Sequence, residues 1–171
     1  VRGVLASRGV QLPEGGPGDS ADALTVFALA EKKNADFNRI LETEGIAPYP
    51  GTALFLDQVA AIPGVQMAVV SSSKNARPIL EMAGITDYFA AVVDGAVAVE
   101  EGLEGKPAPD TFLRAAELLG SDASRAVVFE DAVSGVKAGR DGGFGHVVGV
   151  DRGAGADELL AAGADVVVAD L

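Results

Sequence analysis

The 171-residue chain contains no cysteine and a single histidine, His146. Without thiols it has neither disulfide bonds nor thiolate metal sites, and one imidazole does not suffice for the usual zinc sites. The sequence also lacks the roughly 18 consecutive apolar residues of a membrane span, and no signal segment opens it. These absences exclude zinc chemistry and lead us to expect a cytoplasmic protein with no membrane partner.

Basic residues are scarce, because 13 Lys and Arg stand against 25 Asp and Glu and give a formal net charge of −12. Such a field repels nucleic acid, which is therefore not an expected partner. An anionic substrate has to be captured by a few local cations, backbone N–H groups or a metal. Individual lysines are therefore informative. Apolar residues make up 49% of the chain, enough for a sizeable core.

Short β-branched runs alternate with helical segments from residue 64 onward, which is typical of a parallel sheet covered by helices. We expect strands within residues 65–70, 90–93, 126–129, 146–150 and 164–168. We expect helices within residues 74–83, 109–119, 133–139 and 156–162. The sequence thus predicts an α/β fold whose sheet is parallel, doubly wound and Rossmann-like.

The first part of the chain has a different pattern. Residues 4–9 resemble the end of a helix, residues 14–20 form a Gly/Pro/Asp loop, and a helical pair is expected across residues 21–43. We therefore divide the chain into a small, partial helical cap at 1–47 and an α/β core at 48–171.

Three hydroxyls, on Ser71, Ser72 and Ser73, end the first expected strand, just before Lys74 and Asn75 open a helix. Ligands of open α/β sheets bind at the carboxyl ends of strands, and a helix start offers N–H groups to an anion. A serine at such a place also caps a helix without any further role. Phosphate binding and capping are both open alternatives here.

Lys106 stands in the segment Gly-Lys-Pro-Ala-Pro-Asp, between Gly105 and two prolines. The prolines restrict the backbone, so the ammonium can be aimed as a point charge at a phosphate. The alternative is a solvated lysine on a loop.

Two adjacent carboxylates, Glu130 and Asp131, close the apolar run at 126–129 and precede a helix that contains Gly135. Mg²⁺ takes one or two carboxylates together with waters and substrate phosphate, so the pair is a candidate magnesium site. The alternative is a helix N-terminus that simply favours acidic residues.

In combination, hydroxyl, ammonium and carboxylates follow the ends of successive strands. This order resembles the haloacid dehalogenase superfamily, and within it the β-phosphoglucomutase-like branch. The segments 71–75, 106–110 and 130–135 are similar to its second, third and fourth motifs. Lys33, in Lys-Lys-Asn, matches a cap lysine that contacts the substrate in that branch. The likeness covers essentially the whole chain.

One motif of the superfamily is missing, because its nucleophile is the first Asp of an Asp-x-Asp pair and no two aspartates here stand two apart. The chain also begins Val1-Arg2, without an initiator methionine. We expect a longer parent protein whose N-terminal segment carries the central strand, the Asp-x-Asp turn and the start of the cap. Without that strand, apolar neighbours such as Val69 and Val128 are expected to be exposed.

The resemblance implies phosphoryl transfer on a sugar phosphate, with Mg²⁺ as cofactor and an aspartyl phosphate formed outside this chain. Lys106 and Ser71 are implied as catalytic, and Glu130 and Asp131 as metal ligands. The implied substrate or phosphate ligands are Ser71, Ser72, Ser73, Asn75, Lys106 and Lys33. Conversion of β-glucose 1-phosphate to glucose 6-phosphate is favoured, and hydrolysis of a sugar phosphate is the alternative. We expect a monomer.

Two other interpretations stay open. One is a non-catalytic phosphate-binding module on the same scaffold, because a fold does not establish an activity. The other is an unrelated nucleotide-binding domain, against which stands the lack of a Gly-x-Gly-x-x-Gly after any expected strand. Two further features stay outside the proposed site: His146 is expected to be structural, and Glu100 and Glu101 to lie on a solvated loop.

Overall fold

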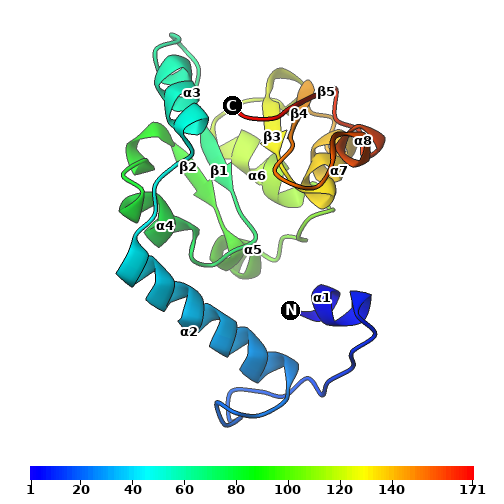
Figure 1. The fold of residues 1–171 in the computed structure, drawn as a ribbon. Helices are drawn as coiled ribbons and strands as arrows, with labels where there is room; N and C mark the ends of the chain where they lie inside the picture. Colours follow the sequence, from blue (N-terminus) through cyan, green and yellow to red (C-terminus); the bar gives the residue numbers. More distant parts are fainter. The chain divides into compact units, whose positions relative to one another are not determined.

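The computed structural model describes the backbone of residues 1–171 and every side chain except those of residues 3, 7 and 42. The chain divides into two compact units, Val1–Ile46 and Ala47–Leu171 (Figure 1). Among the described residues, no helix is both long enough and apolar enough to cross a membrane.

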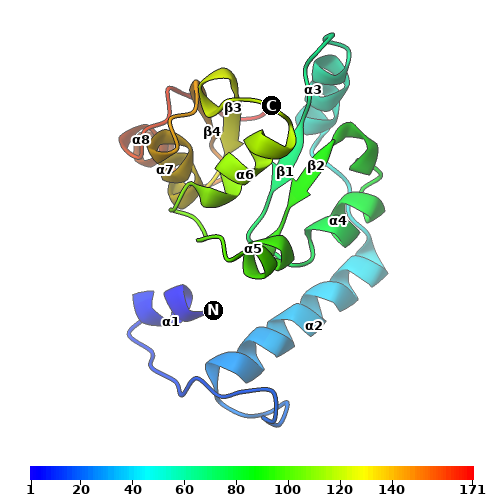
Figure 2. The same cartoon turned by 180° about the vertical axis from the view of Figure 1, so that it is seen from behind.

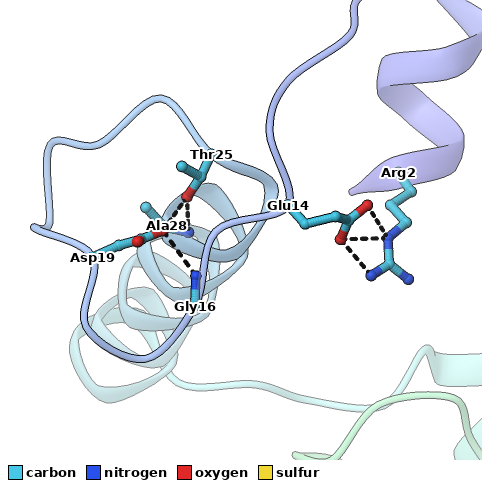
Figure 3. A network of polar contacts seen from close by, with 6 residues as sticks. All are labelled: Arg2, Glu14, Gly16, Asp19, Thr25 and Ala28. Atoms are coloured by element: carbon cyan, nitrogen blue, oxygen red, sulfur yellow. Dashed lines mark hydrogen bonds and ion pairs between the residues drawn. The ribbon is translucent and has the colours of Figure 1, made fainter.

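The first unit consists of α1 (Arg2–Ser7), a long loop and α2 (Val26–Glu44). Thr25 caps α2 by accepting a hydrogen bond from the N–H of Ala28, and its hydroxyl in turn donates to Asp19 (Figure 3). The expected helical pair is wrong, because α2 is one uninterrupted helix. No glycine or proline occurs within it, and those are the residues that break helices.

The second unit contains five short parallel strands in two sheets (Figures 1 and 2). One sheet pairs β1 (Ala68–Val70) with β2 (Ala91–Val93). The other has the order β3 (Val127–Glu130), β4 (His146–Val150) and β5 (Val166–Val168). The α/β class is confirmed, while the strands form two sheets instead of one.

The second unit also contains six α-helices, of which α3 precedes the first strand and the others connect the strands, together with two short 3₁₀ turns at Thr86–Tyr88 and Ala123–Arg125. The helices are α3 (Pro50–Ala60), α4 (Ala76–Met82), α5 (Gly95–Glu101), α6 (Asp110–Leu118), α7 (Val133–Asp141) and α8 (Ala156–Ala161). Helix α6 packs against β1 and β2, α7 against β3 and β4, and α8 against β4 and β5.

The largest apolar core lies around β3 and β4, where Val136, Val147 and Leu159 are fully buried. The expected exposure of Val128 is wrong, since only 4% of it is exposed. Successive strand residues point to opposite faces, so Val128 faces Gly139 of α7, while Val127 and Phe129 are 51% and 39% exposed.

The loop expected at Glu100 and Glu101 is also wrong, because both residues lie in the last turn of α5. The helix has clear end signals. The Asp94 carboxylate accepts hydrogen bonds from the N–H groups of Ala96 and Val97, and Gly102 follows the last turn with φ of 68°. Its β-branched valines, which favour strands, conceal these signals in the sequence.

Asp165, just before β5, links that strand to β4 and α7. Its carboxylate accepts hydrogen bonds from Arg140 at 2.5 Å and from the N–H of Val147 at 2.8 Å. These bonds hold the pKa of Asp165 below its usual range, and the hydrogen bond from Arg140 has the larger effect of the two. His146 lies at the start of β4 with Nδ1 3.4 Å from this carboxylate.

This arrangement predicts that Asp165→Asn lowers the melting temperature at pH 7. A carboxyl whose pKa is lowered by folding stabilises the protein above its unfolded pKa of about 4, and the benefit is lost as the pH falls through the folded pKa. Thermal unfolding at pH 7 and at pH 3 should therefore show a smaller difference between variant and wild type at pH 3. An equal difference at both pH values, or the same profile for the exposed Asp122→Asn control, would contradict this role.

Candidate active site

Lys106 joins the carboxyl ends of the two sheets. Its Nζ donates hydrogen bonds to the carbonyl oxygen of Val70, at 3.3 Å, and to Oε1 of Glu130. The Lys106 and Glu130 side chains are only 11% and 9% exposed, and Nζ lies 4.6 Å from the centre of the Phe112 ring. Lys106 is thus a mostly buried ammonium with a fixed partner, in contrast to a solvated loop lysine.

The loop that carries Lys106 is held by a hydrogen bond between residues on either side of the lysine. Asp110, at the start of α6, accepts a hydrogen bond from the N–H of Glu104 at 3.1 Å. The Lys106–Pro107 peptide bond is cis. Phe112 lies in the first turn of α6, and the face of its ring contacts the ammonium.

The serine segment after β1 makes a compact turn. The Ser71 N–H donates to the carbonyl oxygen of Val93 at 2.9 Å, so the segment continues the pairing with β2. The hydroxyl oxygen of Ser71 accepts from the N–H of Ser73, and that of Ser73 accepts from the N–H of Asn75, both at 3.1 Å. Both hydroxyls therefore cap the turn, and each still has an O–H donor for a ligand.

Gly95, the first residue of α5, allows the start of that helix to lie close to the serine turn. A Cβ at residue 95 would lie 2.6 Å from the carbonyl oxygen of Ser72. The N–H of Gly95 also donates to the carbonyl oxygen of Ser73, at 3.2 Å. Sequence reasoning missed this residue, although a glycine near the end of a strand is a known sign of close backbone contact.

The two acidic residues after β3 have different surroundings. Glu130 is buried, is bound by Lys106, and accepts a hydrogen bond from the N–H of Ala132 at 3.3 Å. Asp131 is exposed and lines a cavity of about 230 Å³ together with Glu130 and Arg152. The cavity lies at the carboxyl ends of β1, β3 and β4, where ligands of open α/β sheets bind.

Glu130 and Asp131 supply carboxylate oxygens to the cavity, and these are ligands that Mg²⁺ takes in proteins. The described residues hold no cluster of three or more Asp, Glu, His or Cys side chains arranged as metal ligands. Mg²⁺ commonly uses one or two carboxylates and takes its other ligands from water and phosphate. Asp131 fits this requirement as an exposed carboxylate beside a cavity, while Glu130 is already neutralised by Lys106.

Lys33 is the one expected site residue that belongs to the first unit, where it is an exposed residue of α2. The others, from Ser71 to Asp131, belong to the second unit. The contact of Lys33 with a substrate stays a prediction.

Gly135 leaves the space that the Glu130 carboxylate occupies, since a Cβ at residue 135 would overlap that carboxylate. We therefore expect Gly135→Ala to displace Glu130 from Lys106 and to lower the free energy of unfolding by about 1–3 kcal/mol. Urea unfolding measures this change, with Gly18→Ala as the control because a Cβ there meets nothing within 4 Å. Equal stability of the two variants would contradict the spacer role.

Residues 9–143 match the family of haloacid dehalogenase-like hydrolases. The chain belongs to this family. The whole chain is 47% identical to a β-phosphoglucomutase of Mycobacterium tuberculosis, and it spans 66% of that relative's length. Over 72% of its length the chain is also 36% identical to the fructose-1-phosphate phosphatase YqaB of Escherichia coli, of which it spans 63%.

A solved structure gives the same result. The β-phosphoglucomutase of Clostridium difficile superposes with a TM-score of 0.68 and 28% identity, over 87% of this chain and 62% of that one. These likenesses confirm the family, and its β-phosphoglucomutase-like branch, that the order of the motifs predicted. The chain spans about two thirds of the length of these three relatives.

Proposed function

We propose that the chain is the larger part of a sugar-phosphate phosphotransferase that converts β-glucose 1-phosphate to glucose 6-phosphate. The observation that carries the proposal is the mostly buried Lys106 ammonium, held by Glu130 where β1 and β3 end. The net charge of the chain repels an anionic substrate, so a local cation such as Lys106 is required to bind it. The 47% identity to a β-phosphoglucomutase supports the sugar phosphate as substrate.

The proposal includes a nucleophile from a further part of the parent protein. An Asp-x-Asp segment on a strand between β1 and β3 would complete the site. Two features support this position: β1 and β3 are each the edge strand of their sheet, and Lys106 contacts the end of both. Val127 and Phe129 of β3 are also partly exposed, as expected for apolar residues of an edge strand that pairs with a further strand in the parent protein.

In the proposed mechanism the residues of this chain stabilise charge. Lys106 neutralises the phosphoryl oxygens during transfer, and its bond to Glu130 keeps it oriented before the substrate arrives. The Ser71 hydroxyl donates to a phosphoryl oxygen while it continues to accept from the N–H of Ser73. Asp131, with Glu130 beside it, would hold Mg²⁺, which when bound supplies further positive charge against the phosphoryl group.

A sugar-phosphate phosphatase is the second candidate, favoured by the 36% identity to a fructose-1-phosphate phosphatase. The two activities differ in the acceptor of the phosphoryl group, which is a sugar phosphate in a mutase and water in a phosphatase. Lys33 is proposed to contact the sugar or its second phosphate and so to favour the mutase outcome.

The parent protein tests both candidates in one assay. Incubation with β-glucose 1-phosphate and Mg²⁺ should produce glucose 6-phosphate, with little inorganic phosphate, and addition of EDTA should stop the reaction. Release of inorganic phosphate as the main product would select the phosphatase. Phosphate binding without turnover by a parent protein of verified sequence would select the non-catalytic module. The cytoplasmic location and the monomeric state stay predictions.

A further inference from the structure

Arg152, in the loop that follows β4, holds the segment that opens α3. Its Nη2 donates a hydrogen bond to the Thr52 hydroxyl at 3.0 Å. Its guanidinium carbon lies 4.2 Å from the centre of the Tyr49 ring, within the range of a cation–π interaction. The Arg152 side chain therefore contacts two residues at the start of α3, Tyr49 and Thr52.

The loop that carries Arg152 is itself fixed. The Asp151 carboxylate accepts hydrogen bonds from the N–H groups of Gly153, at 3.1 Å, and Gly155, at 3.0 Å. These two bonds hold the pKa of Asp151 below its usual range. The N–H of Asp151 donates to the carbonyl oxygen of Val168 at 2.8 Å, which ties the loop to β5. Arg152 therefore lies in a turn that is held by three hydrogen bonds of Asp151.

The same guanidinium belongs to the candidate active site. Arg152 lines the cavity of about 230 Å³ together with Glu130 and Asp131. Helix α3 also contacts the wall of that cavity, because the ring of Phe55 packs edge-on against that of Phe129 with their centres 4.9 Å apart. Two contacts therefore link α3 to the cavity: Phe55 packs on Phe129 of its wall, and Arg152 of its rim binds the start of the helix.

Tyr49 has a particular place in the chain. The second unit begins at Ala47, so Tyr49 lies in the segment through which the chain passes from one unit to the other. Tyr49 is 59% exposed, so its position depends on few contacts, of which the one with Arg152 is charged. Fixing this residue limits the backbone freedom at the start of α3.

We infer that Arg152 is a positioning residue that anchors the start of α3, through Tyr49 and Thr52, to the rim of the proposed phosphate and metal cavity. The kinetic consequence rests on the proposed function, in which this cavity binds the phosphoryl group. A looser start of α3 misplaces the Phe55 ring that packs on the cavity wall, and small misplacements remote from the reacting atoms lower rates considerably.

Hydrogen exchange of the 171-residue chain tests the anchor without reference to activity. In Arg152→Gln, the amides of residues 53–56, which form the first hydrogen-bonded turn of α3, should exchange roughly three- to tenfold faster than in the wild type, while those of α7 should be unchanged. Tyr49→Leu should accelerate the same amides. The double variant should add little to either single variant, because both remove one contact. Unchanged exchange in Arg152→Gln, or full additivity, would overturn the inference.

Kinetics of the parent enzyme test the consequence. Arg152→Gln should lower kcat/KM for the sugar phosphate about tenfold, mainly through KM, and Arg152→Lys should recover part of the loss because it keeps the cation. Arg114→Gln is the matched control, since that guanidinium is also held by two partners, Glu101 and Glu117, and does not line the cavity. Wild-type kcat/KM in Arg152→Gln would overturn the positioning role. A parent enzyme with no turnover would refute the proposed function, while the exchange experiment still decides the anchor.

Discussion

Replacement of Lys106 by alanine is expected to lower kcat of the parent enzyme by about 10²–10³. Loss of one preorganised charge donor to a transition state commonly costs this much. The Lys106 ammonium is preorganised, because Glu130, the Val70 carbonyl group and the Phe112 ring hold it in a mostly buried position. Steady-state formation of glucose 6-phosphate at saturating substrate measures the effect.

Two checks separate this chemical role from a loss of structure. Far-ultraviolet circular dichroism must show that Lys106→Ala is folded at the assay temperature, since the substitution also removes one member of a buried ion pair. Lys137→Ala, which removes an exposed lysine of α7, should retain wild-type kcat. If Lys106→Ala kept more than half of the activity, Lys106 would have no part in phosphoryl transfer.

Glu130→Ala is expected to lower the free energy of unfolding of the 171-residue chain by about 3–5 kcal/mol. Removal of one partner from a buried ion pair leaves the other charge without compensation, and here the stranded group is the Lys106 ammonium, 11% exposed. The substitution also removes the acceptor for the N–H of Ala132. Urea unfolding at pH 7, analysed by linear extrapolation, measures the loss.

A second variant identifies the cause of that loss. The double substitution Glu130→Leu with Lys106→Met replaces the pair by apolar groups, and it should recover most of the stability because no buried charge is left alone. Glu81→Ala, at an exposed position of α4, should change stability by less than about 0.5 kcal/mol. A loss below 1 kcal/mol in Glu130→Ala would show that the pair is solvated and does not position Lys106.

The strands were predictable from the sequence, because each one contains at least two adjacent valines and lies between segments of helix formers. The helices α3 and α5 were not. Pro50 and Gly51 are residues typical of turns, whereas a proline at the first position is also a normal helix start. In α5 the two valines outweighed Asp94 and Gly102, which are the residues that mark the ends of that helix.

The positions of the candidate residues in the fold were predictable from the sequence, while their contacts were not. The order of hydroxyl, lysine and carboxylates along the chain placed them at strand ends, which the fold brings to one edge. The bond between Lys106 and Glu130 joins residues 24 positions apart, so no local pattern reports it. The same holds for Gly135, whose missing side chain matters only because Glu130 fills the space. Arg152 was missed because its partners, Tyr49 and Thr52, are about a hundred residues earlier.

The central claim is that these residues complete a phosphoryl-transfer site with an Asp-x-Asp nucleophile from the rest of the parent protein. Intact-mass spectrometry of the parent protein, acid-quenched during turnover of β-glucose 1-phosphate with Mg²⁺, tests it most directly. The account predicts a chain heavier than the 17.2 kDa of these residues, with an adduct of one phosphoryl group that maps to the first Asp of that motif. A mass of 17.2 kDa that stays unchanged in the presence of the sugar phosphate would contradict it.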